Sequence, residues 1–376
     1  MSKTDNGDII LSLAAFFQIA VLMLQEILVS SNIVTHESFR NASIMLSALP
    51  MIPAAYIFIK RRLSLFLITY SFILYLILLT LIFYPENEKY LLPGTFYILC
   101  INVPGFLCLA SIVDIKILKK ILFFISYLIF VLGLIYLFLL WIGKIAFLSY
   151  SITFSYYLLL PALVFVGQQK KRFTFIFIII CIMMLLVGSR GALVAAIIYA
   201  SMLLFIDRKN RKNILLITSV LVVVIVSGSF LSLFLKLSDN MAVTSRTMDL
   251  FLKGDIIQGS SRSDLYSTVW ESILNNPFWG YGIFGDRIIL DGTWSHNFFL
   301  EIFHNFGLFF GTALILVLSY MSILVLVNSD IEGKKFLLMF FCFGFFPLMV
   351  SGSYLIQTGF GLFIGSLFLT RKNLIL

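Results

Sequence analysis

The stretch "FTFIFIIICIMMLLVGSRGALVAAIIYASMLLFI", residues 173–206, sets two apolar runs on either side of a single arginine, Arg190. As helices, the runs 173–187 and 192–206 would each span ~22 Å, whereas the hydrocarbon core of a bilayer is ~30 Å thick. The pattern predicts two short membrane helices joined by a tight turn at "GSRG", residues 188–191. We therefore expect Arg190 to lie beneath the surface of the membrane.

The composition of the whole chain indicates a membrane protein. Of the 376 residues, 61% are hydrophobic and only 12% are charged, and the mean hydropathy is +1.05. Soluble domains are about 45–50% apolar and about 25% charged. The four cysteines lie inside apolar runs, so we interpret them as core residues and not as disulfides or metal ligands. We expect a single polytopic membrane domain over residues 1–376.

Apolar runs that span a bilayer, or nearly do, recur along the chain. They predict an all-α membrane protein with about twelve transmembrane helices. A long loop, residues 236–304, separates the ninth of these helices from the tenth. The runs are 9–29, 41–59, 63–84, 91–112, 121–141, 145–166, 173–187, 192–206, 213–235, 305–327, 335–350 and 353–369.

The polar links between these runs alternate in charge. One set, which includes "KRR" (60–62), "GQQKKRF" (167–173) and "DRKNRKN" (207–213), carries most of the 27 lysines and arginines. The other set includes "YPENEKY" (84–90) and the long loop, and it carries few basic residues for its length. Because basic links stay in the cytoplasm, we expect the first set and both termini there, and the long loop on the outer side. The net charge of +9 is therefore interpreted as a signal of orientation and not of nucleic-acid binding.

An arginine at the predicted depth of Arg190 needs a compensating partner. Basic residues fix the cytoplasmic ends of its two helices, which places Arg190 ~5–8 Å below the outer boundary of the hydrocarbon core. An arginine at full depth costs about 2–3 kcal/mol. Two interpretations stay open. Arg190 reaches up to lipid headgroups at an ordinary helical hairpin, or it is a recessed receptor for an anion, since a guanidinium binds two phosphate oxygens at once.

The long outer loop contains a predicted amphipathic helix. In "SRSDLYSTVWESILNNP" (261–277), Ser261 and Asp264 are typical of a helix start, and "NNP" ends the helix. Arg262 falls in the first turn, where unpaired backbone N–H groups favour an anion. A cation there is unfavourable unless it shares that anion, so Arg262 is a second candidate anion ligand, with a salt bridge or simple exposure as the alternatives. The apolar stripe, expected to face the bilayer surface or other helices, is Leu265, Tyr266, Val269, Trp270, Ile273 and Leu274.

A histidine precedes the predicted tenth transmembrane helix. In "GTWSHNFFLEIFHNFGLFFG" (292–311), Ser295 is a suitable N-cap, which puts His296 at the first helical position. The positive end of the helix disfavours an imidazolium, so we expect His296 to be neutral and able to accept a proton, as a general base requires. A structural histidine is the alternative. Glu301 and His304 do not complete a zinc-site spacing with His296, and we expect no metal.

These motifs together resemble the O-antigen polymerase and O-antigen ligase superfamily (Wzy and WaaL types). The resemblance is carried by "GSRGA" between two short helices, by "SRSDLYSTVWESILNNPFWGYG" in the loop and by "SHNFFLEIFHNFGLFFG" before the next helix, over residues 170–311. It implies an all-helical membrane glycosyltransferase of the GT-C kind. The implied donor is a glycan on undecaprenyl diphosphate. Transfer would occur at the periplasmic face of the bacterial inner membrane, without a metal, a nucleotide sugar or another cofactor.

The resemblance also implies roles for three residues. Arg190 and Arg262 would hold the diphosphate, and His296 would activate the acceptor hydroxyl. Two arginines suit a diphosphate leaving group because they stabilise the charge that develops on it, and a neutral hydroxyl gains from a nearby base. We expect lipid-linked oligosaccharide and membrane lipids as partners, with a chain-length regulator as a further candidate and no nucleic acid. Further residues expected to line the site are Arg246, Tyr281, Asn297, Glu301 and His304.

Three activities fit these expectations to different degrees. A polymerase transfers the glycan to another lipid-linked repeat unit, and a ligase transfers it to lipid A–core. The segment "HNFFLEIFHNFGLFFG" (296–311) is more similar to the polymerase type, which we favour. A flippase or transporter for the same lipids is the third alternative. It is disfavoured because the two halves of the chain are not similar and because the candidate charges collect at the outer end.

Overall fold

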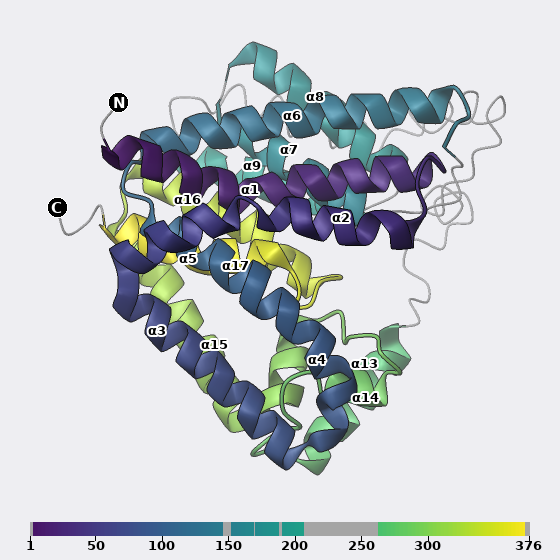
Figure 1. Ribbon diagram of the computed structural model, residues 1–376, viewed down its shortest axis with the longest axis vertical. Coiled ribbons are helices and arrows are strands. Elements are labelled where there is room, and N and C mark those ends of the chain that lie inside the picture. The colour runs from purple at the N-terminus through teal and green to yellow at the C-terminus, as the bar shows by residue number, and fades with distance from the viewer. Residues whose placement is uncertain (1–2, 146–151, 169, 188–189, 207–261, 373–376) are drawn as a thin grey trace. The chain divides into compact units, whose positions relative to one another are not determined.

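The computed structural model describes residues 3–145, 152–168, 170–187, 190–206 and 262–372, and every regular element in these ranges is a helix. The predicted all-α class is confirmed. The chain falls into two compact units (Figure 1), one made of Met1–Pro50 and Asp114–Ile256, the other of Met51–Val113 and Ile257–Leu376. The predicted run 213–235, Arg246 and most of the long loop lie outside the described residues.

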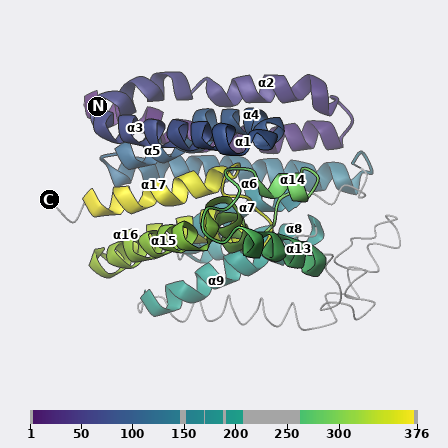
Figure 2. The same cartoon turned by 90° about the horizontal axis from the view of Figure 1, so that it is seen from below.

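The first unit is a bundle of long apolar helices. Its α1 lies between α2 and α6 (Figure 2), and α7 packs against α8 and α9. Asp114 caps α6 by accepting a hydrogen bond from the Lys116 amide, and its own amide donates to the Asp8 carboxylate of α1 at 2.8 Å. The helices are α1 (Lys3–Ser30), α2 (His36–Ala48), α6 (Ile115–Trp141), α7 (Ile152–Gly167), α8 (Lys171–Val187) and α9 (Arg190–Ile206).

The two short helices predicted around Arg190 are α8 and α9. The described part of each has 17 residues, which corresponds to a rise of ~26 Å against a hydrocarbon core of ~30 Å. Arg190 is the first residue of α9. Buried alanines, Ala192, Ala195, Ala196 and Ala200, line the inner face of α9 and allow its close approach to neighbouring helices. Gly188 and Ser189 lie outside the described residues, so the predicted depth of Arg190 stays a prediction.

The second unit is built around the pair α5 and α17. Two glycines of α17 in a G-x-x-x-G spacing face α5. A Cβ on Gly361 would collide with the Asn102 carbonyl oxygen, and a Cβ on Gly365 would lie 2.8 Å from Leu109. The absence of side chains at these positions therefore lets the two helices pack closely. The helices are α3 (Met51–Phe83), α4 (Glu88–Tyr97), α5 (Val103–Ser111), α13 (Arg262–Asn275), α14 (Asp286–Ile289), α15 (Phe298–Asn328), α16 (Ile331–Phe340) and α17 (Thr358–Lys372).

Among the residues that the structure describes, five helical segments are long and apolar enough to cross a membrane: Asp5–Ser30, Ala42–Phe83, Pro85–Ser111, Ile115–Trp141 and Phe298–Asn328. Three shorter apolar helices, Thr153–Gly167, Gly191–Ile206 and Thr358–Leu369, accompany them. The chain is thus an integral membrane protein, and a total of twelve spans stays a prediction. The break predicted at "KRR" (60–62) coincides with a kink in α3, where Arg62 has the non-helical angles φ −143° and ψ 48°.

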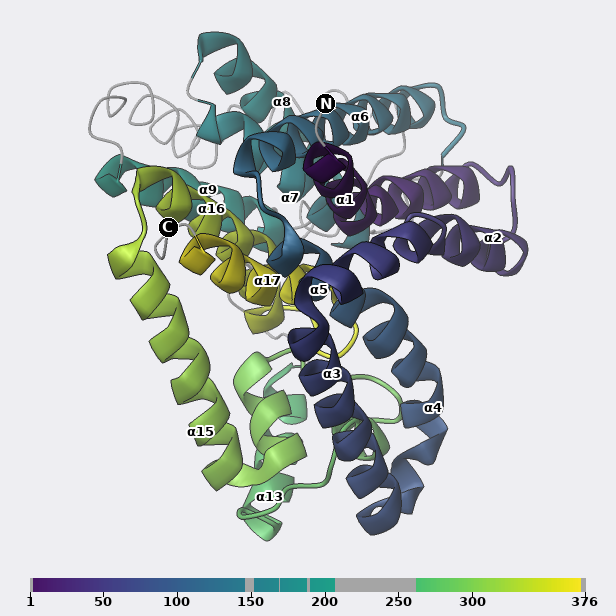
Figure 3. The same cartoon turned by 60° about the vertical axis from the view of Figure 1, so that its left-hand side comes forward.

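α15 bends sharply at Gly307, where the backbone has φ +74° and ψ 170° (Figure 3). The bend releases backbone groups that an unbroken helix would pair. A loop that begins at Pro277 satisfies them: the Tyr281 amide donates to the His304 carbonyl at 2.8 Å, and the Leu308 amide donates to the Pro277 carbonyl at 2.6 Å. The helix that begins after His296 is therefore interrupted at Gly307, inside the run 305–327 predicted as the tenth transmembrane helix. The loop of residues 277–282 fills the break.

Gly307→Ala is expected to destabilise the protein strongly. A Cβ at this position would lie 2.3 Å from the Phe278 carbonyl oxygen, in a left-handed backbone. Overpacking costs about 1–3 kcal/mol beyond the backbone strain. We expect a clear fall in the melting temperature of the detergent-purified protein. Gly143→Ala is the matched control, since Gly143 has φ +72° and a Cβ added there would meet nothing within 4 Å. Equal falls for the two variants would contradict the steric argument.

Candidate active site

Helix α13 supplies the first candidate residue. It begins at Arg262 and ends at Asn275, as the sequence predicts. Of the predicted apolar stripe, Val269 and Ile273 are buried, whereas Trp270 and Leu274 are 43% and 54% exposed. The helix therefore packs through a narrow face and leaves aromatic surface uncovered. Ser261, the predicted cap partner of Asp264, lies outside the described residues.

The side chain of Arg262 is fixed by a backbone carbonyl. Its Nη1 donates to the Val350 oxygen at 2.6 Å. Val350 follows the 3₁₀ turn Phe346–Met349, and the amides of residues 350–352 all point back to the Pro347 oxygen. The carbonyl groups of Val350 and Ser351 therefore project from the carboxyl end of a helical turn, where partial negative charge favours cationic donors. One guanidinium nitrogen is used in this contact, and Arg262 remains half-buried.

His296 contacts the next carbonyl along the chain. Its Nδ1 lies 2.9 Å from the Ser351 oxygen. Because a carbonyl oxygen only accepts, Nδ1 carries the hydrogen, and Nε2 holds the lone pair of the neutral ring. The Trp294 indole donates to the same oxygen at 2.9 Å, and its ring centre lies 5.0 Å from that of the histidine. The contact thus selects the tautomer in which Nε2 is a base.

Burial lowers the pKa of His296, and the positive charge of Arg262 lowers it further, while the hydrogen bond to Ser351 acts in the opposite direction. The expected neutral imidazole is supported, but for a reason the sequence did not reveal. The N-cap of α15 is Asn297, whose Oδ1 accepts from the Phe299 and Leu300 amides at 3.0 and 3.2 Å. The predicted Ser295 cap is therefore wrong, and His296 precedes the helix with a left-handed φ of +53°.

The structure brings Arg262 and His296 together through adjacent carbonyl groups. Arg190 belongs to the other compact unit, and its side chain is outside what the structure describes. A meeting of all three residues in one pocket stays a prediction. Arg246, expected to line the site, lies outside the described residues as well.

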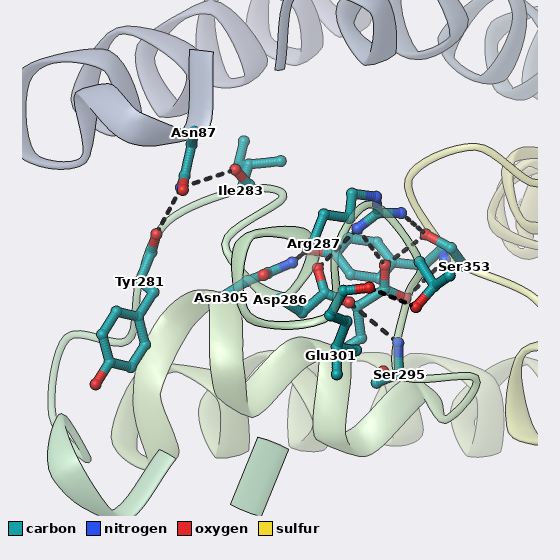
Figure 4. Close-up of polar contacts among 12 residues, drawn as sticks. Asn87, Tyr281, Ile283, Asp286, Arg287, Ser295, Glu301, Asn305 and Ser353 are labelled. Atoms are coloured by element: carbon teal, nitrogen blue, oxygen red, sulfur yellow. Dashed lines mark hydrogen bonds and ion pairs between the residues drawn. The ribbon is translucent and has the colours of Figure 1, made fainter. Parts of the chain in front are cut away.

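A buried ion cluster that was not predicted from the sequence joins α14, the start of α15 and the segment before α17 (Figure 4). We use this name for Asp286, Arg287, Glu301 and Ser353. Arg287 Nη1 pairs with Asp286 at 2.7 Å and with Glu301 at 3.3 Å, and its Nη2 donates to Ser353 at 2.8 Å. The adjacent opposite charges of "DR" (286–287) were a visible signal. Their partners in α15 and near α17 follow only from the tertiary fold.

The other predicted lining residues have mainly structural contacts. Tyr281 stacks on the buried His304 with ring centres 4.8 Å apart, and His304 Nε2 lies 3.1 Å from the Ser272 hydroxyl. Glu301 accepts hydrogen bonds from Ser353 and from the Tyr354 amide. His296, Glu301 and His304 thus have separate partners. Within the ranges that the structure describes, no group of three or more His, Cys, Asp or Glu side chains is placed to hold a metal ion.

An apolar groove of about 540 Å³ runs between α13 and the start of α15. Its walls come from the helices that begin at Arg262 and directly after His296. The lining residues are Tyr266, Ser267, Trp270, Asn297, Phe299, Leu300 and Phe303. Neither Arg262 nor His296 is among these lining residues, whereas Asn297, which lies between His296 and α15, is one of them.

Residues 175–316 match the family model described as O-antigen ligase. Arg190, Arg262 and His296 all fall inside the matched segment. A comparison with curated proteins and one with solved structures each gave no match. The matched family covers both O-antigen polymerases and ligases. Over residues 175–316, which are less than half of the chain, the protein is therefore similar to the O-antigen polymerase and ligase superfamily.

Proposed function

We propose that the protein is an O-antigen polymerase. It moves a glycan from undecaprenyl diphosphate to a hydroxyl at the non-reducing end of another lipid-linked repeat unit, on the periplasmic side of the inner membrane. Members of the superfamily are glycosyltransferase-like enzymes that act on lipid-linked oligosaccharides. The observation that carries the proposal is that Arg262 Nη1 and His296 Nδ1 bind the adjacent carbonyl groups of Val350 and Ser351, which leaves His296 Nε2 as the basic nitrogen.

The proposed reaction assigns one task to each group. His296 Nε2 takes the proton of the acceptor hydroxyl, and the oxygen forms a bond to the anomeric carbon of the donor glycan. The bond from that carbon to the diphosphate oxygen breaks, and the electron pair leaves with undecaprenyl diphosphate. Arg262 stabilises the charge that develops on this leaving group, and we assign the same task to Arg190. The proton ends on His296, which returns it to water or to the departing diphosphate.

The contacts of the second unit support a site on the outer side. Two links predicted to be outside meet there, because Tyr84 of the link 84–90 donates to the Gly280 carbonyl of the long loop at 2.7 Å. The link "KRR" (60–62), which is predicted to be cytoplasmic, contacts another part of the unit: Arg61 donates to the Ser111 carbonyl at 3.0 Å. This separation is what the alternation of charge along the chain predicts.

A ligase is the second candidate, since the matching family model is described as O-antigen ligase. Deletion of the gene, followed by electrophoresis of the surface polysaccharide, separates the two. Lipid A–core that carries single repeat units identifies a polymerase. Loss of all attached glycan, with lipid-linked polymer accumulating, identifies a ligase and overturns the proposal.

Transfer by the purified protein is expected to continue in excess EDTA. Two guanidinium groups supply the positive charge that a divalent ion supplies in other glycosyltransferases, and they bind phosphate oxygens in pairs. The measurement is polymer formation in detergent with and without the chelator. Strong inhibition that Mg²⁺ reverses would contradict the assignment of Arg190 and Arg262 to the diphosphate.

A further inference from the structure

We propose that Arg287, at the centre of the buried ion cluster, is a positioning residue that holds His296 in the geometry needed for glycan transfer. The inference rests on the proposed function, because it assigns to Arg287 an effect on the proposed base. Arg287 is only 4% exposed, so it does not act by touching a substrate. Its effect has to pass through the residues that it binds.

His296 needs such support for two reasons. Its φ of +53° is uncommon for a residue other than glycine, and such backbone persists only where the surroundings impose it. Its ring is oriented by a single hydrogen bond, from Nδ1 to the Ser351 oxygen at 2.9 Å. A shift of either the loop or this carbonyl would turn Nε2 away from the acceptor.

The cluster binds the chain at Ser295, the residue before His296, and includes Ser353, close in sequence to Ser351; Figure 4 labels Ser295 and Ser353. On the backbone side, the Ser295 amide donates to Asp286 Oδ2 at 3.2 Å, and Asp286 is paired with Arg287. On the ring side, Ser353 lies two residues after Ser351, and it receives a hydrogen bond from Arg287 Nη2 at 2.8 Å. A single guanidinium therefore connects the residue before His296 with the segment that orients its ring.

The geometry of these contacts requires an arginine. Nη1 reaches both carboxylates while Nη2 reaches Ser353, and the guanidinium carbon lies 4.4 Å from the centre of the Phe284 ring. A lysine carries the same charge at one point and lacks the planar fork that serves three partners at once. Arg287→Lys should preserve the charge of the cluster and loosen the connection between its two sides.

The test measures transfer kinetics of the purified full-length protein. The substrate is the lipid-linked repeat unit extracted from a strain that lacks this gene. Arg287→Lys is expected to lower kcat about 10- to 100-fold, since small misplacements of a catalytic group have effects of this size. KM for the donor should stay nearly unchanged, because the diphosphate ligands are intact. A raised KM with an unchanged kcat would overturn the inference.

A double-mutant cycle separates positioning from general loss of structure. If Arg287 acts through His296, Arg287→Lys should have no further effect once His296 is alanine. Equal fold losses in the two backgrounds would overturn the inference. Full activity of His296→Ala alone would instead overturn the proposed function, so the two failures are distinguishable.

Two further variants complete the experiment. Ser353→Ala removes one connection and leaves Asp286, Arg287 and Glu301 in place. It replaces Arg287→Lys in the same cycle if the lysine variant does not fold. Asp291→Asn is the matched control. Asp291 is exposed in the same loop and has φ +49°, a conformation that asparagine also tolerates. It should retain the wild-type kcat, and a loss as large as that of Arg287→Lys would overturn the specific role of the cluster.

Discussion

Replacing His296 with asparagine is expected to slow glycan transfer by about 10²- to 10⁴-fold, the usual contribution of a general base. Donor binding should change little, because no diphosphate ligand is removed. Asparagine is a better replacement than alanine, because it readily adopts the positive φ of residue 296 and so preserves the loop. Measurements of single-turnover transfer and of donor binding on the same preparation test the prediction. Equal losses in transfer and binding would show that His296 has a structural role.

The same prediction has a pH signature. The unprotonated imidazole is the active form, so kcat/KM should be high at neutral pH and fall as the pH drops through the pKa of His296. Burial and the charge of Arg262 keep this pKa below the usual 6.5. The acid limb of the profile should therefore lie below pH 6.5 and should be absent from the residual activity of His296→Asn. An unchanged acid limb in that variant would assign the titration to another group.

The sequence predicted the helices better than it predicted their ends and breaks. Apolar runs such as 121–141 and 173–187 correspond to α6 and α8 within a few residues, because burial in lipid or protein requires the same composition. The kink at Gly307 was not predicted, since an apolar pattern continues through it. The bend depends on a loop from elsewhere in the chain that pairs the released backbone groups. No local signal specifies that partner.

The residues of the candidate site were likewise predicted only in part. Arg262 and His296 were recognisable because each lies at a helix start with a local electrostatic consequence. The choice of Asn297 over Ser295 as the cap was not predictable, because both residue types are good caps. Arg287 was missed for a physical reason: charged residues in an outer loop are normally solvated, and only the fold buries this one between two carboxylates. Sequence patterns identify groups that act locally, whereas connections between distant segments require the structure.

Arg262→Ala is expected to abolish polymer formation in cells, with the protein still inserted in the membrane. Removing a group that stabilises charge on a leaving group costs about 10²- to 10³-fold. Loss of binding to the donor diphosphate adds to this effect, so KM should rise and kcat should fall. Arg262→Lys should restore part of the activity, because it keeps the charge but not the paired contact. Arg190→Ala should behave like Arg262→Ala if the two residues hold one diphosphate.

Arg61 provides the matched control for this prediction. It belongs to the same compact unit, is half-buried like Arg262, and likewise donates Nη1 to a backbone carbonyl, that of Ser111 at 3.0 Å. Arg61→Ala should therefore lose a similar contact and retain transfer. The acid limb of the pH profile offers a second readout. Because the positive charge of Arg262 lowers the pKa of His296, this pKa should rise in Arg262→Ala. The residual activity of that variant should therefore begin to fall at a higher pH than the activity of the wild type. Normal polymer from Arg262→Ala, or equal losses from both alanine variants, would remove the guanidinium from the proposed reaction.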